Sequence, residues 1–71
     1  MARIESGAIK VIEIIGISKK SFDDAVKNAL SEASKTVKNI DSIWVKDFKC
    51  HVSNQQIATY WVICKISFRV E

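Results

Sequence analysis

Apolar residues recur every three or four positions between residues 21 and 39, which is the spacing of a helix with one buried stripe. The stripe consists of Phe22, Ala25, Val26, Ala29, Leu30, Ala33 and Val37. Ser21 precedes it and can cap the helix by accepting a bond from an otherwise unpaired backbone N–H, and Asp24 partly completes a capping box. We therefore predict an amphipathic helix over Ser21–Asn39, and its small alanines favour close packing on a flat sheet.

Three other stretches are rich in β-branched and apolar residues, which predicts strands. After a lead-in over Met1–Gly7, the first strand is expected at Ala8–Ile15, the second at Ser42–Val52 and the third at Ile57–Val70. The polar segment Ser53–Gln56 between the last two strands is typical of a turn, because asparagine tolerates left-handed backbone angles. The elements thus follow one another as β-α-β-β.

The third predicted strand has one almost entirely apolar face, which we expect to meet the helix. This face carries Ala58, Tyr60, Val62, Cys64, Ile66, Phe68 and Val70. Because the strand is also partly apolar on its other face, it belongs in the middle of a sheet. The predicted fold is α+β, with a three-stranded antiparallel sheet in the order 1-3-2 packed on one helix. Gly16, between the first strand and the helix, is expected to take a backbone angle that other residues avoid.

A single helix covers only one face of such a sheet. The other face would keep Trp44, Ile57, Trp61 and Ile63, a larger apolar patch than soluble monomers normally expose. Fourteen strand residues reach about 45 Å and nineteen helical residues about 28 Å, so the strands should also extend beyond the helix. Both points predict a homo-oligomer that uses the second sheet face and the strand ends.

The composition agrees with one small domain over residues 1–71, since 48% of the residues are hydrophobic and none is proline. A core of this size rarely supplies more than about 3–5 kcal/mol, which again favours oligomerisation. The net charge of +3 is mild and no basic run is present, so a nucleic-acid partner is not expected. No stretch has the pattern of a signal peptide or membrane span, and we expect a cytoplasmic protein with no membrane partner.

Candidate catalytic and metal-binding residues are few. One histidine, His51, and two separated cysteines, Cys50 and Cys64, do not make a zinc site, and no nucleophile has a base and an orienting group nearby. We therefore do not predict an enzyme. The cysteines are interpreted as buried small hydrophobes, with a disulfide across the hairpin as the alternative. His51 is interpreted as an exposed residue near a strand end.

Four basic residues on the strands could bind a phosphate or could be solvated and ion-paired side chains. They are Lys46, Lys49, Lys65 and Arg69.

The chain resembles the dodecins, a family of small flavin-binding proteins, over nearly its whole length. The similar stretches are KVIEIIGIS, SFDDAVKNALSEASKTVKNI and YWVICKISFRVE. The family's commonest positions carry Gly16, Ser18, Ser21, Ala25, Ala29, Ala33, Thr36, Lys65 and Phe68. The resemblance implies a β-α-β-β protomer, a hollow shell of twelve copies, and flavin held in pairs at two-fold contacts. It also implies storage or buffering of the ligand, without catalysis.

The two residues that contact flavin in the family are replaced in this chain. By the resemblance, Ser42 stands where the family has a tryptophan that stacks on the flavin ring, and Trp61 stands where a glutamine bonds the ring edge. Trp44, two residues past Ser42 on the same strand face, retains an aromatic surface. The candidate cofactor-binding residues are Trp44, Trp61, Ser42 and Lys46, and the implied cofactor is a flavin, either FMN or riboflavin.

Two functions therefore stay open from the sequence. In the first, the tryptophans stack on a flavin or a similar flat aromatic ligand. In the second, they fill the pocket themselves, which leaves a structural or interaction shell that holds ions or another ligand.

Overall fold

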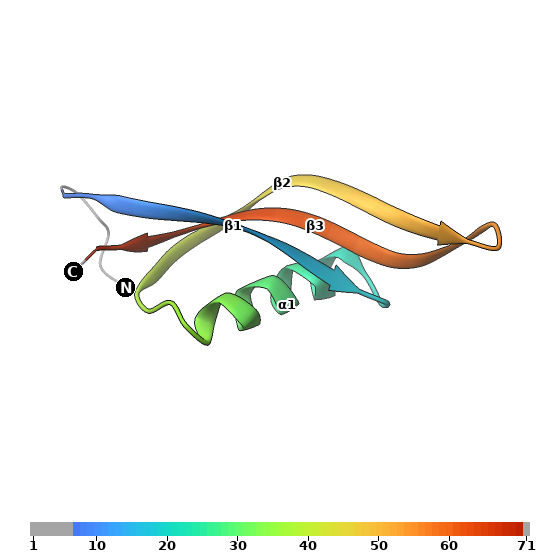
Figure 1. Cartoon of the computed structure of the whole chain (residues 1–71), viewed down its shortest axis with the longest axis horizontal. Helices are drawn as coiled ribbons and strands as arrows, with labels where there is room; N and C mark the ends of the chain where they lie inside the picture. Colours follow the sequence, from blue (N-terminus) through green and yellow to red (C-terminus); the bar gives the residue numbers. More distant parts are fainter. Residues whose placement is uncertain (1–6, 71) are drawn as a thin grey trace.

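The computed structural model describes residues 7–70 and contains one helix and three strands in the order β-α-β-β (Figure 1). Strand β1 spans Ile9–Ser18, helix α1 spans Phe22–Ser34, strand β2 spans Ile40–Ser53 and strand β3 spans Gln56–Arg69. The strands form one antiparallel sheet in the order β1-β3-β2. The predicted α+β fold and strand order are confirmed, and most of the lead-in predicted over Met1–Gly7 lies outside the described residues.

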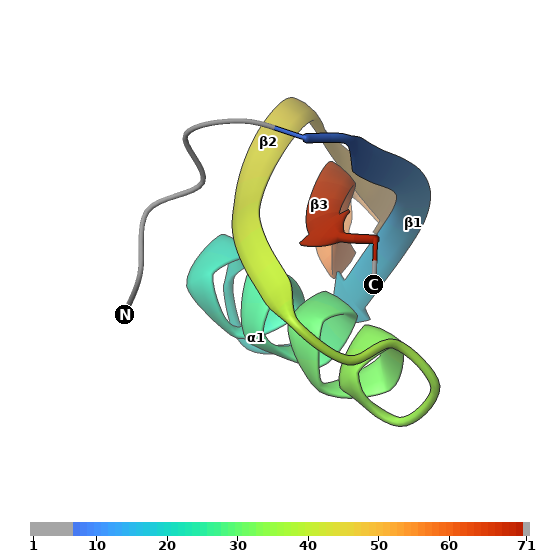
Figure 2. The same ribbon diagram turned by 90° about the vertical axis from the view of Figure 1, so that its left-hand side faces the viewer.

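The core lies between β3 and one face of α1. Val62, Cys64 and Ile66 of β3 are all 0% exposed, as predicted for the apolar face of the third strand. The alanine stripe of the helix, Ala25, Ala29 and Ala33, is buried against the sheet. Viewed end-on, the sheet curves around the helix, which covers one face only (Figure 2). Fully burying a valine or isoleucine side chain contributes about 1.5–3 kcal/mol, so this contact is the main source of protomer stability.

Gly16 was expected to start the connection to the helix with an unusual backbone angle, and this prediction is wrong. Strand β1 continues through Gly16 to Ser18, and Gly16 is not among the residues with positive φ. A Cβ at this position would overlap the carbonyl oxygen of Ala25 and lie 2.9 Å from the Cβ of Ala29. Glycine is therefore required because the backbones of β1 and α1 approach each other closely here.

The predicted cap of the helix is confirmed, but the predicted end is wrong. The Ser21 hydroxyl accepts a bond from the Asp24 backbone N–H at 3.0 Å. The helix ends at Ser34, five residues before Asn39, and Asn39 adopts a left-handed φ of 61°. Its carbonyl accepts a bond from the Arg69 N–H at 3.1 Å, which joins the chain to the sheet rather than to the helix.

The hairpin between β2 and β3 is tighter than the predicted four-residue turn. Only Asn54 and Gln55 lie between the strands, and both have positive φ, at 52° and 65°. Two such residues match the twist of antiparallel strands in a type I′ turn. The hairpin extends well beyond the helix, as the strand lengths predicted (Figure 1).

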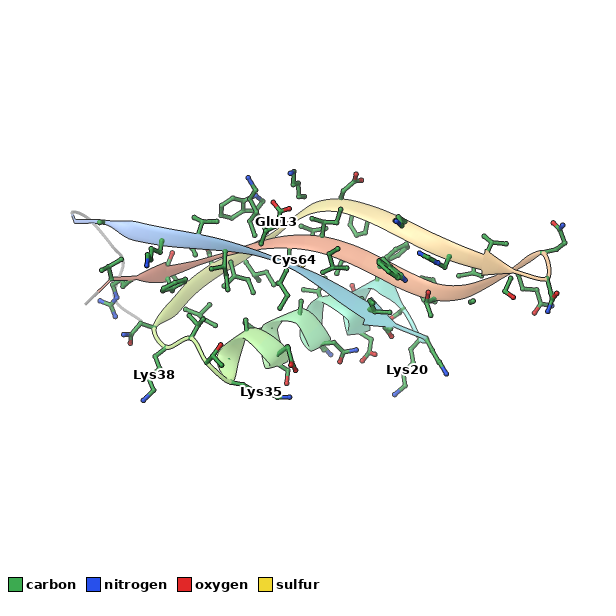
Figure 3. The ribbon with its side chains drawn as sticks, in the orientation of Figure 1. Glu13, Lys20, Lys35, Lys38 and Cys64 are labelled. Carbon is green, nitrogen blue, oxygen red and sulfur yellow. The ribbon has the colours of Figure 1, made fainter. Side chains whose placement is uncertain are left out.

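Both cysteines are free, so the disulfide alternative is wrong. Cys50 pairs with Tyr60 across the hairpin, and Cys64 pairs with Val45 further along β3. Cys64 points toward the helix (Figure 3), and burial raises the pKa of its thiol. Within residues 7–70, α1 is too short and too polar to cross a membrane.

Candidate functional site

The sheet face away from α1, called the outer face below, carries the predicted functional residues. Strand register places Glu13, Lys65 and Trp44 side by side across the three strands, and Ile17, Trp61 and Lys49 in a parallel row nearer the hairpin. Strand β1 adds apolar side chains that are 44–48% exposed on the same face: Ile9, Val11, Ile15 and Ile17. The expected apolar second face is thus present in the protomer.

Trp44 lies at the β2 end of the first row and is 47% exposed. Its partner Lys65 separates it from Glu13, whose side chain points away from the helix in Figure 3. Lys46 lies at a register shift between Val45 and Asp47, and its ammonium is 3.6 Å from the Glu13 carboxylate. Two lysines therefore surround one carboxylate beside an open indole, and the row keeps an excess positive charge.

Ser42 is exposed near the start of β2, two residues before Trp44 on the same face. Its hydroxyl lies 2.6 Å from the hydroxyl of Ser67 on β3, so the two share a hydrogen bond. Ser67 is buried and was not predicted as part of the site. Alternation along each strand predicts that both serines lie on the outer face. That they pair with each other follows only from the register of β2 and β3.

Trp61 has a different environment from Trp44. The imidazole of His51 is stacked on its indole, with ring centroids 4.3 Å apart and planes 13° apart. The indole N–H donates to the Thr59 hydroxyl at 2.9 Å, and the Lys49 ammonium is 5.0 Å from the ring centroid. His51 is exposed near the end of β2, as predicted, and in addition makes this stacking contact. The register supplies the reason, since His51 pairs with Thr59, two residues from Trp61.

The structure does not bring the two tryptophans together within one protomer. Trp44 pairs with Lys65 and Lys49 pairs with Trp61, so the indoles are separated by four residues along β3. At about 3.3 Å per residue this is about 13 Å, which is too far for one planar ring to stack on both. The outer face therefore offers two separate aromatic surfaces, one open and one covered by His51.

Polar chemistry on this face consists of lysines, hydroxyls and single carboxylates. Among residues 7–70, no three histidine, cysteine, aspartate or glutamate side chains come together in a group that could hold a metal ion. The arrangement can stack a flat ring on Trp44 and place cations beside it.

Comparison with known proteins identifies relatives over almost the whole chain. A curated dodecin of Thermus thermophilus is 29% identical over 62 residues, which cover 87% of this chain and 90% of that protein. The solved dodecin from Streptomyces coelicolor is 33% identical with a TM-score of 0.88, and the match covers 90% of this chain and 91% of that one. A Mycobacterium tuberculosis structure described as a calcium-chelating calcium dodecin is 29% identical with a TM-score of 0.81, over 92% and 93% of the two chains.

The family assignment agrees with these individual matches. The protein-family model described as Dodecin matches residues 8–71. It includes both strands that carry the tryptophans and the helix with its alanine stripe. This protein belongs to the dodecin family.

Proposed function

We propose that this protein is a cytoplasmic, non-catalytic homododecameric shell that binds and buffers a flavin or a similar flat aromatic molecule. The observation that carries the proposal is Trp44, a large aromatic side chain that is 47% exposed on the outer face, beside Lys65 of the central strand. An indole held on a sheet offers a rigid surface for offset stacking, which contributes about 0.5–1.5 kcal/mol beyond the area it buries.

The neighbours of Trp44 suit a ligand that carries polar or anionic groups. Lys65 is adjacent in the register, and Lys46 is paired with Glu13. Because that pair is half exposed, it contributes at most about 1 kcal/mol, and a ligand phosphate can compete for Lys46. The Ser42 hydroxyl, bonded to Ser67, lies where it can exchange hydrogen bonds with a ring edge. FMN and riboflavin both fit this chemistry.

Self-association supports the same proposal. The dodecin relatives share this fold, and the exposed stripe of β1, Ile9, Val11, Ile15 and Ile17, gives the protomer an apolar face that a second copy can cover. An interface on the outer face would enclose Trp44 between copies. Exclusion of water there would strengthen stacking and charge contacts with a bound ligand.

A second candidate function is a shell of the same architecture without a flavin site. The observation in its favour is the stack of His51 on Trp61, because an indole that is already covered resembles a pocket filled by its own side chains. In this case the outer face would serve assembly alone.

Light scattering and flavin fluorescence titration test the proposal together. We expect a single species of about twelve times the 8.0 kDa protomer mass, and quenching of FMN or riboflavin fluorescence by the wild-type protein. Trp44→Ala should weaken binding by at least tenfold, whereas Leu30→Ala on the helix should leave it unchanged. A monomer would contradict the assembly. Unchanged flavin fluorescence with an intact assembly would favour the second candidate.

A further inference from the structure

The second aromatic surface of the outer face has the features of a site that its own histidine occupies. His51 and Trp61 lie almost parallel, with planes 13° apart and centroids 4.3 Å apart, as a ring ligand and its platform would. The two residues come from adjacent strands, β2 and β3. Trp61 pairs with Ile17 near the end of β1, whereas His51 pairs with Thr59, one residue past the last β1 pairing at Tyr60. The stack therefore lies where the three-stranded sheet passes into the two-stranded hairpin.

The two rings are held very differently. Trp61 is half-buried in the central strand, and its N–H bond to the Thr59 hydroxyl fixes the direction of the indole plane. His51 is exposed on the edge strand β2, where its side chain can rotate into solvent. When the imidazole leaves, the platform thus keeps its orientation, and only one exposed side chain has to move.

The geometry points to His51 as an internal competitor for the ligand: its imidazole covers the face of Trp61 on which a flat heteroaromatic ring would stack, and a bound ring displaces it. This inference rests on the proposed function, in which flat rings stack on the outer face, and adds a second surface for such a ring together with its regulation. A fused ring system covers more of an indole than an imidazole does, so exchange gains contact area. The cost is the loss of the His51 stack, and removal of His51 should therefore tighten binding.

Charge around the platform defines the ligand class. The Lys49 ammonium is 5.0 Å from the Trp61 ring centroid, and Asp47, the nearest acidic residue of β2, pairs with Ile63, two residues further along β3. The hairpin residues 52–59 carry no charge. A neutral or anionic ring is compatible with this environment, whereas a cationic ring would meet an uncompensated lysine.

The single histidine of the chain makes the displacement directly observable. In the NMR spectrum of the assembled wild-type protein, the His51 ring protons should be shifted upfield by the indole ring current. Addition of lumichrome, a neutral tricyclic flavin analogue, should return them toward the position of a solvated histidine. Proflavine, a cationic tricycle of similar shape, should bind more weakly than lumichrome.

Titration of variants completes the test. His51→Ala should bind lumichrome about two- to tenfold more tightly than wild type, which is the range expected from one aromatic stack. Val52→Ala, the neighbouring position on β2, is the matched control and should leave affinity unchanged. Equal affinity in wild type and His51→Ala, or a histidine signal that does not move, would overturn the inference. If, in addition, Trp44→Ala abolished lumichrome binding, the ring would be bound at Trp44, and the proposed function would stand without the inference about His51. Failure of every variant to bind any ring would overturn both.

Discussion

Replacement of Gly16 by alanine tests how closely the helix lies on the sheet. The added Cβ would overlap the carbonyl oxygen of Ala25, and it would lie 2.9 Å from the Cβ of Ala29 and 3.0 Å from the carbonyl carbon of Ala25. Two of these three atoms belong to the helix backbone, so no rotamer change can make room. The helix must move away from β1 as a body, or β1 must bend.

The expected loss of stability depends on which packing contacts are broken when α1 moves away from the sheet. Extra atoms in a packed core usually cost about 1–3 kcal/mol, and a rigid backbone obstacle places this case at about 3 kcal/mol or above. A shift of the helix also opens the contact of Ala25 and Ala29 with Val62 and Cys64, the buried cluster of the protomer. One core in a domain of this size supplies about 3–5 kcal/mol, so the substitution should remove most of the stability of the protomer.

Urea unfolding followed by circular dichroism, at one fixed protomer concentration, measures this cost. We expect Gly16→Ala to lower the free energy of unfolding by at least about 3 kcal/mol or to prevent assembly. Adding Ala29→Gly should restore little, because the overlap with the Ala25 carbonyl remains. A free energy of unfolding of Gly16→Ala within about 0.5 kcal/mol of the wild-type value would refute the reasoning. Where the native backbone has room for a Cβ, replacing glycine by alanine stabilises a protein by about 0.4–1 kcal/mol, because it restricts the unfolded chain.

Two further predictions concern the hairpin and the buried thiol. Gln55→Gly should raise the free energy of unfolding by about 1 kcal/mol, because Gln55 holds a left-handed φ of 65° that glycine adopts without a Cβ clash. Asn54→Gly should raise it by less. A urea midpoint of Gln55→Gly equal to or below that of wild type would contradict the argument. Burial raises the pKa of Cys64, so the folded thiol stays protonated where the unfolded one ionises. The free energy of unfolding should therefore fall as pH rises past the ordinary thiol pKa of 9.0. Urea titration at several pH values measures this loss, and Cys64→Ala should remove it. Native protein should also react with iodoacetamide at Cys50 well before Cys64, and equal rates would show that the strand is open.

Local pattern was sufficient for the elements of this fold and for their order. The alanine stripe and the Ser21 cap are properties of neighbouring residues, and both appear in the structure as predicted. Alternation along β2 and β3 separated the buried face from the outer face, which placed Trp44 and Trp61 correctly away from the helix. The helix end was missed because Asn39 leaves the helical conformation and bonds to β3, a contact between distant parts of the chain.

The site depended on pairing between strands, which alternation does not specify. The register shift between Val45 and Asp47 and the two-residue turn at Asn54 and Gln55 set which β2 residue faces each residue of β3. That register separates the tryptophans by four residues and sets His51 diagonal to Trp61. The sequence by itself determined which residues are apolar, aromatic or charged on each face. Only the tertiary structure decided which of them touch, because a shift of one residue across the hairpin moves every side chain to new partners.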